Sequence, residues 1–194
     1  LWTRNTSSAE LAVILSTVLA ADRASELLDD IRQGDSGRRR QATDELLAEM
    51  MPSLHALCVN TLGSGADAED ALQEALIAIY RALDSFRGES KVSTWAYRIT
   101  IRVAMRHAVK RKRNVSMNLE DTLAAVGDAM TAVRAKEIFE ALDKLSQKHR
   151  VVLALFAIQG LSHEEVASVL GIAAGTVWSR LHHARQALGA ILQE

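Results

Sequence analysis

The sequence contains a single proline among its 194 residues, and this feature constrains the fold more than any other. Proline breaks helix interiors, so its near absence, together with abundant Ala and Leu, permits long helices. Strands favour β-branched and aromatic side chains, but aromatic residues make up only 4% of the chain. Hydrophobic residues make up 48%, which is enough to build packed cores. We therefore predict a folded, all-α protein.

The length and the cysteine content bear on the organisation and location of the chain. A length of 194 residues fits one domain or two compact units of under about a hundred residues each. The one cysteine, Cys58, lies in an apolar stretch and has no partner for an internal disulfide, so we expect a buried structural thiol. No apolar run reaches the ~20 residues that span a bilayer. Stable membrane insertion is therefore not expected, and the cytoplasm is the expected location.

An acidic cluster marks the first charged segment. Asp67, Glu69, Asp70 and Glu74 bring four acids into eight residues, with no base among them. Apolar residues recur through this stretch at three- and four-residue steps, which predicts a helix whose buried face excludes the acids. Acids in a first turn suit the helix dipole, but they also suit a contact surface for a basic partner, and both interpretations stay open. The apolar row is Ala68, Leu72, Ala75, Leu76, Ile79 and Leu83.

A basic segment follows directly, hidden by the net charge of −1 of the whole chain. Residues 81–113 contain ten Lys or Arg against two acids. Thr94 is expected to cap a helix that begins at Trp95. The following basic row does not separate cleanly from its apolar neighbours, so the buried face stays undetermined. A solvated face is one interpretation, but the basic run over residues 110–113 favours contact with a phosphate backbone. The row consists of Arg98, Arg102, Arg106 and Lys110.

The second half of the chain contains the pattern of a helix-turn-helix. Two periodic apolar stretches come first and end at Gln159 and Gly160. Ser162 and Glu165 then form a capping box at the start of a short helix, and Gly171 permits a sharp turn before a helix over residues 176–188. A short helix, a glycine turn and a longer helix make a helix-turn-helix. The apolar residues of the two stretches are Ile138, Leu142 and Leu145, then Val151, Val152, Leu155 and Ile158.

The last helix carries candidate DNA-reading side chains on its outer face. Its inward row is Val177, Leu181, Ala184 and Leu188, and its outward residues are Trp178, Ser179, His182 and Arg185. Such a helix can serve core packing alone, but polar and basic outward residues favour the major groove. His182 and the adjacent His183 lie about 100° apart on a helix, with no acid or thiol at a suitable step. Hydrogen-bond donors or phosphate contacts are therefore favoured, and no metal or cofactor is expected.

Five motifs occur in an ordered series along the chain. They are DAEDALQE over residues 67–74, FRGES over 86–90, TWAYRI over 94–99, LSHEEVA over 161–167 and GTVWSRLHHAR over 175–185. Each motif alone is modest evidence, but their order and spacing are highly specific. Together they resemble the RNA polymerase sigma factors of the extracytoplasmic function (ECF) group, group 4 of the sigma-70 family. The resemblance covers residues 25–192.

The resemblance implies two small helical domains joined by a flexible linker. Sigma region 2 is expected over residues 25–113, the linker over 114–132 and sigma region 4 over 133–194. Residues 1–24 lie outside the family pattern and are expected to form an extra helical segment. The implied partners are core RNA polymerase, promoter DNA and an anti-sigma protein. Neither enzyme activity nor a homo-oligomer is expected.

The resemblance also implies roles for individual residues. The loop from Phe86 to Lys91 matches one that captures a base flipped out of the −10 element. No Gly-rich phosphate loop occurs, so ATP is not expected to drive the opening of the DNA duplex. The energy for strand separation is expected to come from binding by the assembled polymerase. The residues implied at the polymerase surface are Asp67, Asp70, Gln73 and Glu74. Those at the −10 element are Phe86, Arg87, Ser90, Lys91, Trp95, Arg98, Arg102, Arg106 and Lys110. Those at the −35 element are Thr176, Trp178, Ser179, Arg180, His182, His183 and Arg185.

Two sites depart from the family pattern. Trp178 stands where relatives commonly carry Arg or Lys, so a bidentate guanine contact is absent and an altered promoter preference is expected. Ala173 and Ala174 stand where a capping Ser or Pro is common. The backbone N–H groups at the start of the predicted helix over residues 176–188 are therefore expected to lack a side-chain acceptor.

Two other classes of protein remain as alternatives. A helix-turn-helix regulator that acts without polymerase would bind duplex DNA tightly alone. It would not need the acidic helix, the base-capturing loop and the basic helix in that order. A nucleic-acid enzyme is the more distant alternative, because no paired metal-binding acids, Cys/His cluster or nucleophile–base arrangement stands out.

Overall fold

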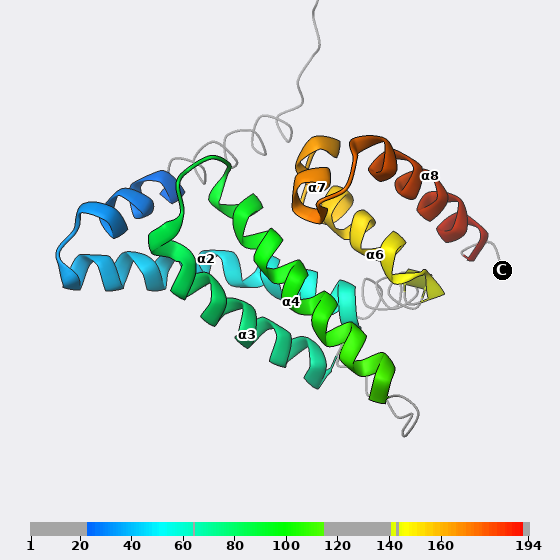
Figure 1. The fold of residues 1–194 in the computed structure, drawn as a ribbon, viewed down its shortest axis with the longest axis horizontal. Coiled ribbons are helices and arrows are strands. Elements are labelled where there is room, and N and C mark those ends of the chain that lie inside the picture. The colour runs from blue at the N-terminus through cyan, green and yellow to red at the C-terminus, as the bar shows by residue number, and fades with distance from the viewer. Residues whose placement is uncertain (1–22, 64, 115–140, 143, 192–194) are drawn as a thin grey trace, which may run out of the picture. The chain divides into compact units, whose positions relative to one another are not determined.

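The computed structural model describes residues 23–63, 65–114, 141–142 and 144–191 (Figure 1). Every regular element in these ranges is helical and none is a strand, which confirms the all-α prediction. The expected N-terminal helix, the linker beyond its first residue and the predicted apolar residue Ile138 lie outside the described residues. The chain divides into two compact units, Leu1–Met50 and Met51–Glu194.

The first unit contains a helix over residues 23–33 and the beginning of α2 (Ser36–Leu62). Asp35 caps α2, because its Oδ1 accepts hydrogen bonds from the backbone N–H groups of Gly37 and Arg38 at 3.0 and 2.9 Å. The bond from Arg38, followed by that from Gly37, lowers the pKa of the Asp35 carboxyl below its ordinary value. Apolar side chains of both helices are buried in this unit.

In the second unit, the end of α2 is followed by α3 (Ala66–Ala82), the short 3-10 helix η1 (Leu83–Ser85) and α4 (Val92–Asn114). Helices α3 and α4 lie side by side (Figure 1). The apolar row predicted for α3 is buried except for Leu76, which is half-buried.

Cys58 on α2 is fully buried, as the apolar pattern around it predicted. Burial raises the pKa of its thiol to about 12, so the sulfur stays protonated at neutral pH. A buried, protonated thiol is a poor nucleophile and a poor metal ligand, and Cys58 therefore serves packing.

Helix α4 begins earlier than the sequence predicted. The backbone N–H of Trp95 bonds to the carbonyl of Lys91 at 3.0 Å, so the first turn starts at Val92. Val92 is buried and anchors this turn in the core. The prediction that Thr94 caps the helix is therefore wrong, and Thr94 is a buried residue inside the first turn. The buried residues that follow it define the inner face of α4, and they are Ala96, Tyr97, Thr100, Ile101, Val103 and Ala104.

The later part of the second unit contains α6 (Gln147–Leu153), the π-helical turn η2 (Ala154–Ile158), α7 (His163–Leu170) and α8 (Ala174–Ile191). The apolar residues of the second periodic stretch are buried in α6 and η2, with the exception of Ile158. Ile158 is 51% exposed, although the periodic pattern grouped it with the buried residues. The wider π turn takes more residues than an α turn and rotates the side chains that follow it away from the expected row.

The helix-turn-helix predicted from the capping pattern is present. The Glu165 N–H donates to Oγ of Ser162 at 3.1 Å, and the Ser162 N–H donates to the Glu165 carboxylate at 2.9 Å, which confirms the capping box. Gly171 ends α7 with φ of 65°, in the left-handed region that favours glycine. Both ends of α7 are thus held by interactions within a few residues of sequence.

Candidate functional site

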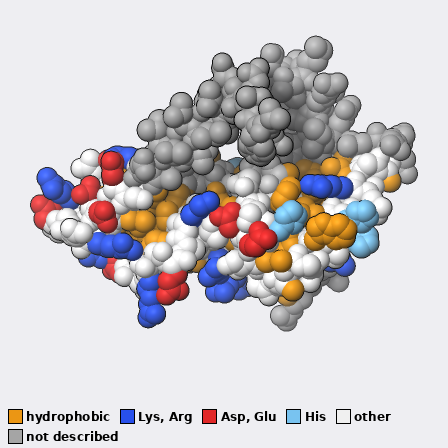
Figure 2. Space-filling view, turned by 90° about the horizontal axis from the view of Figure 1, so that it is seen from above, with side chains coloured by type: hydrophobic (Ala, Val, Ile, Leu, Met, Phe, Trp, Pro, Cys, Tyr) orange, Lys and Arg blue, Asp and Glu red, His pale blue; other side chains and the backbone are white. Residues whose placement is uncertain are grey.

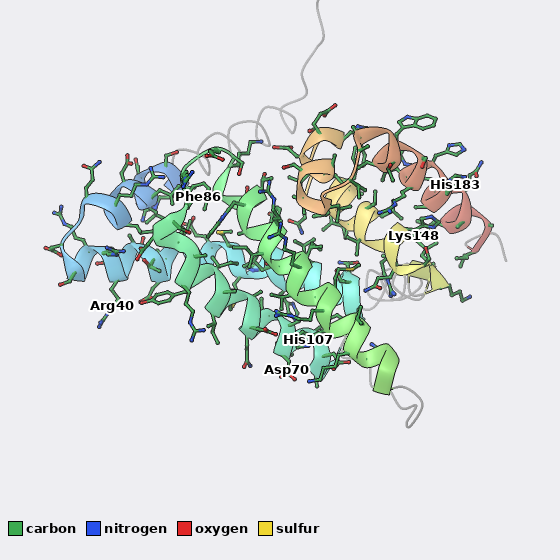
Figure 3. The ribbon with its side chains drawn as sticks, in the orientation of Figure 1. Arg40, Asp70, Phe86, His107, Lys148 and His183 are labelled. Atoms are coloured by element: carbon green, nitrogen blue, oxygen red, sulfur yellow. The ribbon has the colours of Figure 1, made fainter. Side chains whose placement is uncertain are left out.

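The residues predicted to bind polymerase lie on α3 and differ in what they contact. Asp70 (Figure 3) and Gln73 are exposed, and no ion pair of Asp70 occurs within the described part of the chain. The opposite face of α3 is buried. These two side chains therefore remain available to a partner.

Glu74 is engaged with α4 instead. Its Oε1 accepts a hydrogen bond from Nη2 of Arg106 at 2.8 Å, and its Oε2 lies 2.8 Å from Nε2 of His107. The hydrogen bond with His107, and then the charge of Arg106, lower the pKa of the Glu74 carboxyl below its ordinary value. A carboxylate with this pKa is fully ionised at neutral pH. Glu74 therefore ties α3 to α4 through both of its oxygens.

Arg111 makes a second connection near the end of α4. Its Nη1 donates to the carbonyl of Leu62, the last residue of α2, at 2.5 Å. Its Nε lies 4.0 Å from Oδ2 of Asp67 at the start of α3. The last carbonyls of a helix lack partners within the helix, so an arginine is well suited to this position. One guanidinium thus joins the ends of α2, α3 and α4.

Two histidines that contact acids of α3 were missed by the sequence reasoning. His107 contacts Glu74, and His55 on α2 lies 2.9 Å from Glu69 on α3. The partners are 33 and 14 residues apart along the chain, so no local pattern pairs them. Only the packing of the helices brings these groups together.

The segment before α4 holds the predicted base-capturing loop. Phe86 is only 8% exposed, and its ring packs on Trp95 with centroids 5.1 Å apart and planes tilted by 47°. Gly88 has φ of 76°, in the left-handed region that favours glycine. Arg87 and Lys91 on either side of it are exposed. The aromatic pair thus supports the loop from inside, while its cations face outward.

The basic row of α4 lies mostly on the side opposite the core. Arg102, Arg106 and Lys110 are exposed, whereas Arg98 and Trp95 are half-buried. Ser90, at the start of this region, is half-buried as well. The exposed guanidinium and ammonium groups form a surface suited to the phosphates of a nucleic acid.

The outer face of α8 carries most of the predicted −35 residues. Trp178 is 63% exposed, and His182, His183 and Arg185 are exposed too. The inner residues Val177, Leu181 and Ala184 are buried, as predicted, and Leu188 is half-buried. The remaining predicted residues, which are Thr176, Ser179 and Arg180, are half-buried.

The first turn of α8 has no side-chain cap of the kind that Ser or Asp supplies. The backbone N–H groups of Thr176 and Val177 bond to the carbonyl of Ala173 at 2.9 and 3.2 Å. The helix thus starts at Ala174, two residues before the predicted start, by backbone bonds alone.

Aromatic and basic groups of α6 and η2 meet α8. The guanidinium of Arg185 lies over the ring of Phe156, 5.4 Å from its centroid. His149 stacks on His183 with centroids 6.4 Å apart, and Lys148 beside it is exposed (Figure 3). Burial, followed by the charge of Lys148, lowers the pKa of His149, so its ring is neutral at neutral pH. Sequence reasoning had not connected His149 or Lys148 with the recognition helix.

Neither a metal-binding cluster nor a membrane span occurs among the described residues. In those ranges, no group of three or more His, Cys, Asp or Glu side chains is arranged to hold a metal ion. None of the helices that the structure describes is long and apolar enough to cross a bilayer.

A hairpin with an acidic and a basic helix, followed by a helix-turn-helix with exposed basic and aromatic side chains, defines a helical DNA-binding protein. Sigma-70 region 2 matches residues 46–114, and sigma-70 region 4 matches residues 135–188. The chain is 31% identical to the RNA polymerase sigma-H factor of Pseudomonas aeruginosa, over 91% of this chain and 97% of that protein. It is also 31% identical to the ECF RNA polymerase sigma-E factor of Escherichia coli K12, over 84% and 90% of the two chains. The chain therefore belongs to the ECF sigma factors of the sigma-70 family.

Solved structures of similar proteins agree with this assignment. The sigma factor RpoE of Bartonella quintana, in complex with the anti-sigma factor NepR, has a TM-score of 0.68 and 26% identity, over 77% of this chain and 96% of that one. CnrH, in complex with the cytosolic domain of CnrY, has a TM-score of 0.64 and 25% identity, over 89% and 97%. The chain is a sigma factor of transcription initiation, and a regulator that acts without polymerase is not favoured.

Proposed function

We propose that three surfaces of this sigma factor divide the work of initiation. The outward acids of α3 bind core RNA polymerase, the loop from Phe86 to Lys91 and α4 bind the −10 element, and α8 reads the −35 element. The observation that carries this proposal is the contrast on α3. One face of the helix is buried, while Asp70 and Gln73 are exposed without a partner in the described residues. In this proposal the domains extend over residues 25–113 and 133–194.

The four polar residues of α3 then contribute in different ways. Asp70 and Gln73 are the direct contacts, since nothing in the described residues engages them. Glu74 and Asp67 are partly exposed and are also bound to α4 by Arg106, His107 and Arg111. They hold the hairpin in the shape that presents Asp70, and they add negative charge for a basic partner surface. Charge complementarity of this kind speeds encounter and fixes register.

The −10 surface combines exposed cations with a supported aromatic pair. Arg87, Lys91, Arg102 and Lys110 neutralise phosphates, which supplies affinity independent of sequence. Phe86 is buried against Trp95, so we propose that it shapes the base-capturing loop from inside. Trp95, which is half-buried, is the better placed of the two to stack on an unpaired base.

The −35 surface follows the geometry of helix-turn-helix proteins, in which the second helix enters the major groove. Trp178 and His182 are placed to meet base edges, while Arg180 and His183 approach phosphates. The guanidinium of Arg185 lies over the ring of Phe156, and we propose that this contact orients Arg185 toward a phosphate.

We further propose that an anti-sigma protein controls this chain. One structural relative was solved in complex with the anti-sigma factor NepR, and another, CnrH, in complex with the cytosolic domain of CnrY. Work with bacterial RNA polymerase would place the protein in the cytoplasm.

Reconstituted transcription tests the proposal. The chain is added to core RNA polymerase with a library of promoter fragments, and run-off transcripts are sequenced. We expect transcripts from promoters that share two conserved elements, and no transcripts from core enzyme alone. Failure to associate with polymerase, combined with tight binding of a palindromic duplex by the chain alone, would support the regulator alternative and overturn the proposal.

A further inference from the structure

An exposed aromatic pair on α8 sets this helix apart from an ordinary basic recognition helix. Trp178 and His182 lie one turn apart, with their rings almost parallel at 4° and their centroids separated by 5.7 Å. Trp178 is 63% exposed, although tryptophan is usually among the more buried residues. On the face shown in Figure 2, hydrophobic surface lies exposed beside histidine side chains.

Further rings hold this pair in place. His182 meets His183 edge-on, with centroids 5.7 Å apart, and His183 in turn stacks on His149 of α6 at 6.4 Å. The indole of Trp178 therefore has an aromatic neighbour in His182 and is otherwise largely exposed. A ring held in this way loses little conformational freedom on binding, which favours affinity.

The position of the pair limits what it can contact. Trp178 is the fifth residue of α8, and residues near the start of a second helix reach base edges in the major groove. Arg180 and Arg185 lie further along α8, so these basic groups can hold phosphates while the indole faces the bases.

The chemistry of the indole limits the choice of base. It offers a broad apolar surface and one N–H donor, and it cannot make the paired hydrogen bonds by which Arg recognises guanine. The only apolar group that a base pair presents in the major groove is the C5-methyl of thymine. We infer that Trp178, braced by His182, contacts the methyl group of one thymine and so selects an A·T pair at one position of the −35 element. This inference rests on the proposed function of α8.

Replacing single thymines by deoxyuridine tests this contact, because the change removes one methyl group and leaves base pairing intact. The assay uses holoenzyme and a promoter recovered from the library, and it measures binding for each thymine of the −35 element in turn. At one position we expect deoxyuridine to weaken binding by about fourfold, the value of one buried methyl. The Trp178→Ala holoenzyme should bind the unmodified promoter more weakly. Replacing thymine by deoxyuridine at that position should then no longer change its affinity.

Two further variants separate a direct contact from a structural role. Trp178→Arg should shift the preferred pair at the same position from A·T to G·C, because Arg restores the bidentate contact. His182→Ala removes the ring stacked on Trp178, so it should reduce the difference in binding between thymine and deoxyuridine. His182→Phe keeps a ring at this place and should retain that difference. Thermal unfolding by circular dichroism checks that all variants fold, as expected for an exposed position.

The possible results separate a failure of the thymine contact from a failure of the proposed function of α8. Absence of promoter-specific transcription would overturn the proposed function itself. Normal transcription with no methyl effect at any thymine, or an equal effect in wild type and Trp178→Ala, would overturn the inference alone. Unchanged promoter binding by Trp178→Ala with lost binding of a purified anti-sigma protein would also overturn it, and would assign the indole to a protein partner.

Discussion

The α3–α4 hairpin and the α7–α8 unit are both helical pairs that present a surface, but different interactions position them. In the hairpin, Glu74 and Asp67 contact basic groups of α4 that lie more than thirty residues away in sequence. In the helix-turn-helix, the capping box and the left-handed Gly171 act within four residues. The hairpin thus uses part of its charge internally and leaves Asp70 exposed. On the outer face of α8, Trp178 is exposed, while Arg185 and His183 contact rings of η2 and α6.

Reversing the charge of Asp70 should have the largest effect. We expect Asp70→Lys to weaken binding of core polymerase by on the order of a hundredfold, because like charges at an interface cost several kcal/mol. Fluorescence titration of the labelled chain with core enzyme measures this loss. Asp44→Lys, at an exposed position of α2, makes the same charge change and should leave binding unaltered. Equal losses in both variants would mean that overall charge, and not this surface, governs docking.

Gly171→Ala tests whether the turn of the helix-turn-helix is held by its backbone. At φ of 65° an L-residue costs about 1–2 kcal/mol, so the free energy of unfolding should fall by that amount. Gly175 provides a matched control within α8, because an added Cβ there meets nothing within 4 Å. Gly175→Ala should be neutral or stabilising by up to about 1 kcal/mol. Urea denaturation compares the two, and equal effects would contradict the role given to Gly171.

Removing the cap of α7 should have a somewhat smaller effect. Ser162→Ala takes away the acceptor for the Glu165 N–H and should lower the free energy of unfolding by about 1 kcal/mol. Ser162→Thr keeps a hydroxyl at the same position and should recover most of the stability. Thermal and urea unfolding give both values. If the threonine variant were as unstable as the alanine variant, the loss would come from packing rather than from capping.

The smallest effect is expected for the carboxylate of Glu74. Partly exposed ion pairs contribute about 0.2–1 kcal/mol, so Glu74→Gln should destabilise the chain only within that range. The folded-state pKa of Glu74 lies below its ordinary value of 4.5, so its contribution is present above that pH and is lost as the pH falls through the folded pKa.

Urea unfolding between neutral and acid pH measures this contribution. Glu74→Gln should flatten the loss of stability on acidification. A double-mutant cycle with Arg106→Ala measures the coupling directly. Additive effects would show that the Glu74–Arg106 contact does not stabilise the hairpin.

Sequence reasoning was accurate where the deciding interactions are local. The apolar rows of α3 and α8 follow the helical period, and the cap of α7 follows the types of residue at fixed offsets. It was wrong where the surroundings overrode a local preference. Thr94 has the side chain of a capping residue, yet the buried Val92 starts α4 earlier, and a π turn moved Ile158 to the surface.

The amino-acid sequence by itself determined the helices, the helix-turn-helix and the ordered motifs that mark the sigma family, because period, capping and glycine turns act over three or four residues. Only the tertiary structure decided which charges are engaged within the hairpin, that Phe86 is buried against Trp95, and that His149 joins the rings beside α8. Those contacts depend on how helices pack in space, and short-range periodicity carries no information about pairs of residues that are distant along the chain.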